Sequence, residues 1–293
     1  TRPTMQLASK NDADMARTDV LQNTRSGPRF FGEGGDAFAG ELGGAAARHR
    51  GGRRTLRFAT EALAILYLIR HAEMRVNAPP EEGPGGLRYA AVPDAPLTAR
   101  GQRQAERLGQ RLEGAPLVAV YSSPYRRAAE TAQAIARPHG LRVLTKQALV
   151  ERDFGEWDGL SADEIGLRHP LGADAFDLSA DFAPPGGETL VQVLDRSLTA
   201  LTEIVARDHS ACTPTPTAST DADVAEGRIA VVAHKTVNRV LLCHWLGLPL
   251  ECFRSIGQDN AAVNVISATT SGPQGEVLWR VRSANDVCHV EGL

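Results

Sequence analysis

The residues of this sequence that are best suited to chemistry stand where apolar runs end. Arg70 and His71 interrupt the stretch "LYLIRHAE", and His234 ends the stretch "RIAVVAH". Arg126 and Arg127 follow a third apolar run, "LVAVYSS". Because a cation or an imidazole at the end of a buried strand must find a partner, these positions predict a binding or catalytic site.

These residue types together suit the chemistry of a phosphoryl group. Arginine binds two anionic oxygens through its planar fork and keeps its charge. One imidazole can attack phosphorus, and a second can hydrogen-bond the oxygens on which charge develops. A carboxylic acid must then protonate the departing alkoxide and activate water afterwards.

The surrounding pattern predicts the elements that position these residues. We expect Thr98 to cap a helix whose buried face carries Ala105, Leu108 and Leu112. Strands are expected at 65–69, 117–123, 229–233, 260–268 and 276–282, an extended segment at 141–151, and helices at 98–112, 125–136, 188–205 and 236–247.

This alternation predicts an α/β fold with three layers, α/β/α, around a mostly parallel central sheet. Ligands of such sheets bind at the carboxyl ends of the strands. Three of the expected strands end in Arg70-His71, in Ser122-Ser123 and in His234, so we expect these residues to meet at one edge.

Six segments in a fixed order resemble the histidine phosphatase superfamily, which has the phosphoglycerate mutase-like fold. The resemblance spans about Ile65 to Val265. The segments are "LIRHAE", "PLTARGQRQAERLG", "YSSPYRRAAETA", "LVERDFGEWDG", "PGGETL" and "VVAHKTVNRVLL".

The resemblance implies a role for each matching residue. His71 corresponds to the phosphorylated nucleophile, and Arg70 corresponds to its phosphate-binding neighbour. The family arginine precedes an alanine, which selects Arg127, while Arg126 is either a solvated helix residue or an auxiliary phosphate contact. His234 corresponds to the second histidine of the family.

Two further roles and two departures follow from the same comparison. Glu151 corresponds to the proton donor, and Asn77 to a phosphate-contacting asparagine of many members. Ala72 replaces the usual glycine after the first histidine. Lys235 replaces the glycine that commonly follows the second one, and a cation there could contact an anionic substrate.

The segment between Glu151 and "GGET" at 186–189 favours a phosphatase over a mutase. It is only about 35 residues long, and its stretch "SADEIGLRHPLGADAFDLSADFAPP" offers one arginine, Arg168, whereas the glycolytic mutases carry a longer insertion with additional arginines. We therefore expect a small phosphomonoester as substrate, with sugar phosphates and sugar-acid phosphates as candidates. A phosphoglycerate mutase-type transferase, a catalytically silent phospho-ligand-binding protein and a protein phosphohistidine phosphatase are the alternatives.

No metal or other cofactor is expected. His71 and Glu73 match the H-x-E fragment of zinc deaminases, but no P-C-x-x-C follows, and the sequence contains no HExxH. Glu73 is instead expected to have a structural role, pairing with an arginine near the rim. Trp157 is expected to pack under the loop that carries Glu151.

The composition limits the partners and the location. The 293 residues are 42% hydrophobic and carry a net charge of −3, so neither nucleic acid nor a membrane is expected as a partner. The four cysteines form no CxxC pair, which favours a cytoplasmic location. A homo-oligomer is left open because no feature of the sequence indicates one.

Two segments depart from the average composition. Residues 1–60 are rich in Arg, Gly, Ala and Asp, which predicts a disordered extension outside the domain at 61–293. The Thr, Pro, Ser and Asp content at about 207–227 predicts a mobile loop.

Overall fold

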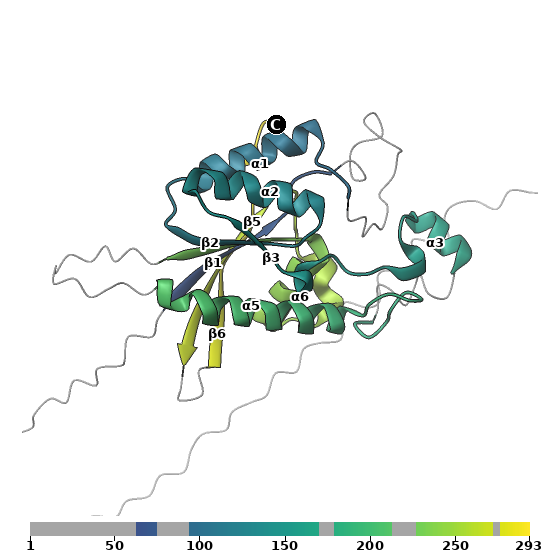
Figure 1. Ribbon diagram of the computed structural model, residues 1–293. Helices are drawn as coiled ribbons and strands as arrows, with labels where there is room; N and C mark the ends of the chain where they lie inside the picture. The colour runs from purple at the N-terminus through teal and green to yellow at the C-terminus, as the bar shows by residue number, and fades with distance from the viewer. Residues whose placement is uncertain (1–62, 75–93, 170–178, 213–226, 272–275) are drawn as a thin grey trace, which may run out of the picture. The chain divides into compact units, whose positions relative to one another are not determined.

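The structure, a computed structural model, describes residues 63–74, 94–169, 179–212, 227–271 and 276–293 (Figure 1). The expected extension at 1–60 lies outside the described residues, and so does Asn77. No helix in the described part of the chain is long and apolar enough to cross a membrane.

A six-stranded mixed sheet forms the centre of the fold, with the strand order β3-β2-β4-β1-β5-β6. The first four strands in this order are parallel, and β5 and β6 are antiparallel to their neighbours. The mostly parallel sheet predicted from the sequence is therefore confirmed. The strands are β1 (Leu63–Arg70), β2 (Leu117–Ser122), β3 (Val143–Thr145), β4 (Arg228–Ala233), β5 (Val263–Ser271) and β6 (Glu276–Asp286).

Helices cover both faces of the sheet (Figure 1). Alternate residues of β1 serve the two faces: Leu66 and Leu68 pack in one core with α5 and α6, whereas Tyr67 and Ile69 pack in the other with α1 and α2. The helices are α1 (Ala99–Leu112), α2 (Arg126–Ala136), α3 (Ala162–Arg168), α5 (Leu190–Cys212) and α6 (Lys235–Leu246). Short 3-10 helices lie at Arg137–His139, Gln147–Leu149, Gly155–Trp157, Leu250–Ser255 and Cys288–Val290.

Two sequence expectations about element boundaries need correction. The helix α5 extends to Cys212, so the first residues of the loop expected at about 207–227 are helical, and most of that segment lies outside the described residues. Within these last helical turns, the Asp208 carboxylate accepts a hydrogen bond of 2.7 Å from the Tyr121 hydroxyl on β2, which ties them to the sheet. The segment expected to be extended at 141–151 contains only the three-residue β3 and then a 3-10 turn.

The register of the parallel strands brings the chemically capable residues to one edge. The backbone N–H of His71 donates to the carbonyl of Ala233 at 3.0 Å, immediately before His234. The backbone N–H of Ser123 donates to the carbonyl of Val232 at 3.0 Å. The ends of β1, β4 and β2 are thus adjacent, as the alternation of elements predicted.

The helices α1 and α2 approach each other closely at Gly109. A Cβ atom at this position would lie 2.5 Å from the carbonyl oxygen of Ala134 on α2, a separation that real Cβ atoms essentially never show. Because the obstructing atom belongs to the backbone, a side chain at Gly109 would have to push the two helices apart.

We expect Gly109→Ala to destabilise the fold by about 1–3 kcal/mol, the usual cost of overpacking. The expected sign is unusual, because alanine in a helix interior normally stabilises by roughly 0.5–1 kcal/mol relative to glycine. Urea unfolding measures the difference. Gly114→Ala is the matched control, since a Cβ atom at Gly114 meets nothing within 4 Å. Equal stability changes in the two variants would contradict the close helix contact.

Candidate active site

His71 lies at the carboxyl end of β1 with 2% of its surface exposed. Its Nδ1 atom is 2.7 Å from the carbonyl oxygen of Ala72. Since a carbonyl oxygen only accepts hydrogen bonds, this contact places the proton on Nδ1. Nε2 is then an acceptor, and the Nε–H of Arg127 donates to it at 3.3 Å. The lone pair of Nε2 therefore points toward the guanidinium side of the site.

His234 lies beside His71, with 5.1 Å between the centroids of the two rings. It follows β4 directly and is fully buried. The Nε2 atom of His234 is 2.8 Å from the Ser123 hydroxyl oxygen. Its buried Nδ1 atom has no hydrogen-bond partner among the described residues. One polar atom of this imidazole is thus left for a ligand.

Two buried guanidinium groups flank the imidazoles. Arg70 ends β1 and donates from Nη1 to the carbonyl oxygen of Gln258 at 2.7 Å, while its buried Nε atom has no partner among the described residues. Arg127 lies in the first turn of α2 and is 1% exposed. Burial lowers the pKa of Arg70 to about 10, so this residue stays cationic near neutral pH. The pair supplies fixed positive charge for an anion.

The same surroundings keep both imidazoles neutral. Burial lowers the pKa of His71 well below its ordinary value of 6.5, and the charges of Arg127 and Arg70 lower it further. Burial has the largest effect on His234 as well, and it lowers the pKa of this imidazole well below 6.5. A neutral imidazole with an unprotonated Nε2 atom can act as a nucleophile through that atom.

Glu151 is the carboxylate whose charge acts most strongly on both Arg70 and Arg127. Its Oε1 atom accepts from the backbone N–H of Arg152 at 2.9 Å, and Oε2 accepts from the backbone N–H of Thr236 at 3.4 Å. Thr236 lies in the first turn of α6, which begins directly after His234. Glu151 as a residue is 8% exposed. Its carboxyl group interacts electrostatically with both Arg70 and Arg127.

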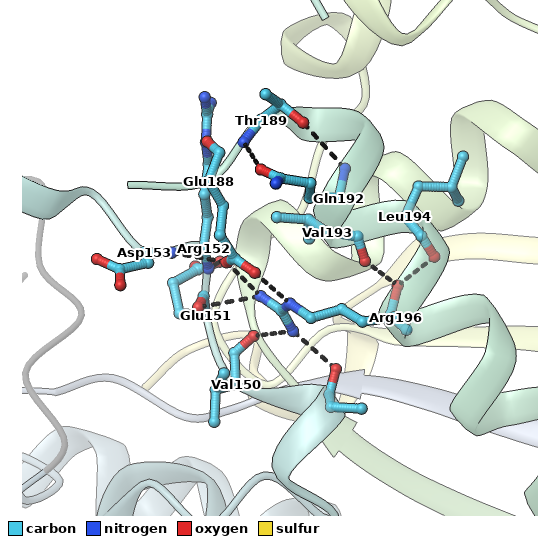
Figure 2. A network of polar contacts seen from close by, with 12 residues as sticks. Val150, Glu151, Arg152, Asp153, Glu188, Thr189, Gln192, Val193, Leu194 and Arg196 are labelled. Carbon is cyan, nitrogen blue, oxygen red and sulfur yellow. Dashed lines mark hydrogen bonds and ion pairs between the residues drawn. The ribbon is translucent and has the colours of Figure 1, made fainter. Parts of the chain in front are cut away.

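Figure 2 shows how the loop that carries Glu151 is held by Arg196 of α5. The Arg196 guanidinium donates to the backbone carbonyls of Ala148, Val150 and Glu151 at 2.7, 2.8 and 3.2 Å. Its Nε and Nη2 atoms bind the two carboxylate oxygens of Glu188 at 2.8 and 2.9 Å. This bidentate pair fixes the loop in place.

Comparison with models of known protein families shows to which family the chain belongs. The model for the histidine phosphatase superfamily (branch 1) matches residues 66–280. The chain belongs to this superfamily. The family and the phosphoglycerate mutase-like fold predicted from the sequence are therefore confirmed, and the protein is an enzyme-family member with phosphatases among its relatives.

Relatives of known or probable activity include both phosphatases and mutases. Phosphoserine phosphatase 1 of Hydrogenobacter thermophilus is 32% identical over 207 residues, covering 69% of this chain and 85% of that protein. The probable phosphoglycerate mutase GpmB of Salmonella choleraesuis is 29% identical over 231 residues, covering 77% of this chain and 94% of that protein.

Solved structures show the same fold. A mycobacterial glucosyl-3-phosphoglycerate phosphatase matches with a TM-score of 0.62 at 26% identity, covering 76% of this chain and 99% of its own. YhfR of Bacillus stearothermophilus matches with a TM-score of 0.62 at 29% identity, covering 78% of this chain and 100% of its own.

This member of the superfamily contains residues near the candidate site that the sequence did not predict. Gln258 accepts the hydrogen bond from Arg70 through its backbone carbonyl. Its side-chain oxygen accepts from the amide groups of Asn238 and Asn264 at 3.1 and 3.0 Å. All three amide side chains are buried, and the run "GQDNAAVN" before β5 was the available signal. They hold the segment to which Arg70 is anchored.

Arg152 and the Arg196–Glu188 pair were missed as well. Arg152 is 1% exposed and donates to the backbone carbonyls of Glu188 and Phe182, each at 2.8 Å. The backbone N–H of Asp153 donates to the Glu188 carboxylate at 2.9 Å. The contacts of Arg152 and Asp153 join residues 30 or more positions apart, and Arg196 and Glu188 are eight positions apart, so no local sequence pattern indicates them.

Three further residues near the site, Glu73, Arg126 and Trp157, can be compared with the sequence expectations. Glu73 pairs with Arg100 at 2.9 Å, as expected for a structural residue. Arg126 is largely exposed and pairs with Glu130 at 2.7 Å, in keeping with a solvated helix residue. Trp157 is buried against Phe154, Ile165, Leu160 and Phe182, so it packs under the loop as expected. Within the described ranges, no group of three or more His, Cys, Asp or Glu side chains is arranged to hold a metal ion.

We expect the free energy of unfolding to fall as the pH drops below about 6.5. The unfolded chain binds protons at His71 and His234 in that range, whereas their lowered pKa values keep them unprotonated in the folded state. Each histidine contributes a slope of up to about 1.4 kcal/mol per pH unit. Urea unfolding at several pH values between about 5 and about 7 measures this slope.

His71→Asn and His234→Asn should each give a shallower slope than the wild type. His244→Asn is the matched control, because His244 is exposed on α6. A slope that is the same in the wild type and in both buried-site variants would show that these imidazoles do not remain neutral on folding.

Proposed function

We propose that this protein is a phosphomonoester hydrolase that acts through a phosphohistidine intermediate. The observation that carries the proposal is the arrangement of His71: its proton is held on Nδ1 by the carbonyl of Ala72, and its Nε2 atom faces Arg127. This is the tautomer that an imidazole nucleophile requires.

In the first proposed step, the Nε2 lone pair of His71 forms a bond to phosphorus while the bond from phosphorus to the ester oxygen breaks. Arg70, Arg127 and His234 bind the phosphoryl oxygens, and Asn77 is proposed as a further contact. The buried Nε atom of Arg70 and the buried Nδ1 atom of His234 have no hydrogen-bond partner in the described part of the chain, which supports this role.

Glu151 is the proposed proton donor of the first step and the proposed proton acceptor of the second. In its protonated form it gives its proton to the departing alkoxide, and it leaves that step as a carboxylate. It then takes a proton from water, whose oxygen attacks phosphorus as the bond to Nε2 breaks. Inorganic phosphate leaves, and neutral His71 and protonated Glu151 are restored. These steps require no metal ion.

Transfer to water is favoured over transfer to a second acceptor by the segment between Glu151 and Glu188. Between Ser161 and Pro185 its one arginine, Arg168, is exposed at the end of α3, and the buried Arg152 donates to the backbone carbonyls of Glu188 and Phe182. Mutase activity is the second candidate, since the probable mutase GpmB matches over 94% of its length.

We expect His71→Ala to lower the turnover of every phosphomonoester by roughly 10³-fold or more, because the nucleophile is lost. Phosphate release is measured with a chelator present on an aryl phosphate, phosphoserine, 3-phosphoglycerate and sugar phosphates. His244→Ala, on an exposed histidine, is the control and should retain activity. An alanine variant of His71 that keeps its rate would refute the proposal. Interconversion of phosphoglycerates by the wild type without phosphate release would identify a mutase instead.

Glu151→Gln should slow hydrolysis of alkyl phosphates by about 10²-fold or more, the usual contribution of a general acid. Aryl phosphates should be affected much less in the bond-breaking step, because their leaving groups need little protonation. Single-turnover measurements on the two ester classes isolate this step. Asp153→Asn, at the exposed carboxylate two residues later, is the matched control. Equal slowing of both esters in Glu151→Gln would assign the acid elsewhere.

A further inference from the structure

Ser123 lies against the imidazole pair but has no part in the steps proposed above. It follows β2 directly, is fully buried, and donates from its backbone N–H to the carbonyl of Val232 on β4. Its side chain is therefore held at the edge where β2 and β4 end. The hydroxyl oxygen lies 2.8 Å from the Nε2 atom of His234. At this distance the two atoms share one hydrogen, which belongs either to the hydroxyl or to the imidazole.

The other contacts of the hydroxyl decide the direction of this hydrogen bond. A serine hydroxyl has one hydrogen to donate and two lone pairs that accept. The backbone N–H of Tyr125 donates to the Ser123 oxygen at 3.3 Å, which occupies one lone pair. Among the residues that the structure describes, the Nε2 atom of His234 is the one acceptor for the hydroxyl hydrogen. Because a buried donor without an acceptor is costly, Ser123 donates and Nε2 accepts.

This direction fixes the tautomer of His234. Burial keeps the imidazole neutral by lowering its pKa well below 6.5, so it carries one proton. With Nε2 accepting, that proton is on Nδ1. The buried Nδ1 atom has no hydrogen-bond partner in the described part of the chain. In this tautomer an N–H is available for a phosphoryl oxygen, whereas the other tautomer would present a lone pair to it.

Neighbouring rings limit the orientation of the same imidazole. The ring of Tyr125 meets it edge-on, with centroids 5.3 Å apart, and the ring of His71 lies 5.1 Å away. A half-turn of the His234 ring would put a carbon in place of Nε2 and break the hydrogen bond from Ser123. The hydroxyl therefore opposes both the ring flip and the change of tautomer.

We infer that Ser123 is a positioning residue: its hydroxyl donates to Nε2 of His234 and so directs the Nδ1–H of this imidazole to the phosphoryl group. The inference rests on the proposed hydrolase function and adds a residue to it. The carbonyl of Ala72 places the proton of His71 on Nδ1 as well. Because the two rings are held through opposite nitrogens, one presents a lone pair to the ligand and the other presents an N–H.

The test measures the tautomer and the rate separately. Ser123→Ala removes the hydroxyl with little change in volume. Ser197→Ala is the matched control, because Ser197 is also fully buried and donates to the carbonyl of Val193 within α5. Urea unfolding shows that both variants are folded. Nitrogen NMR of protein labelled with ¹⁵N-histidine shows which ring nitrogen carries the proton, and His234→Asn assigns the resonances of His234.

We expect the wild type to carry the His234 proton on Nδ1, and inorganic phosphate to shift this N–H resonance. Ser123→Ala should move most molecules to the Nε2–H tautomer. It should also lower kcat for phosphomonoesters by roughly tenfold or more, because a donor to the developing charge is lost. KM should change by less than about threefold, since Arg70 and Arg127 still bind the phosphoryl group. Ser197→Ala should change neither the tautomer nor the rate.

Three results would overturn the inference while leaving the hydrolase function intact. They are a His234 proton on Nε2 in the wild type, a tautomer that is the same in the wild type and in Ser123→Ala, and a Ser123→Ala variant that keeps its kcat. Absence of phosphate release from every ester would overturn the proposed function instead. The NMR comparison with inorganic phosphate as the ligand would then decide by itself whether Ser123 sets the tautomer.

Discussion

The packing of two neutral imidazoles against two permanently charged guanidinium groups is the constraint on which this structure depends. The rings of His71 and His234 lie 5.1 Å apart, and the Nε–H of Arg127 reaches the Nε2 atom of His71. Burial and neighbouring positive charge both oppose protonation of the histidines, so surroundings that favour an anion also keep the imidazoles neutral, as the proposed nucleophilic role of His71 requires. Buried guanidinium groups would destabilise an apolar core, but here they supply the positive charge of the candidate site.

The sheet supplies the rigidity that this arrangement needs. Because β1 and β4 are parallel neighbours in register, Arg70 lies opposite Ala233, and the two histidines follow these residues directly. The strands are apolar on both faces, so a shift of register would expose one core or bury the wrong side chains. The hydrophobic cores on the two faces of the sheet thus fix the separation of the imidazoles.

The sequence predicted the parts of the site that stand at the ends of apolar runs, because strand ends of a parallel sheet share one edge. His71 and His234 could be found in this way, and the family resemblance then separated Arg127, which is buried, from Arg126, which pairs with Glu130 at the surface. Arg196 could not be found, because it resembles any solvated helix residue until its distant partners are known. The extension of α5 to Cys212 was missed for a similar reason, since the partner of Asp208 lies on β2.

The contacts around Arg196 have a consequence for how such a protein can diversify. The backbone of Asp153 is bonded to Glu188, 35 residues later, and Arg196 holds both sides of this junction. The intervening segment is therefore a loop closed at its base, and its length and sequence can vary without moving Glu151. Natural variation can therefore change this segment while the contacts that hold the backbone of Glu151 stay the same.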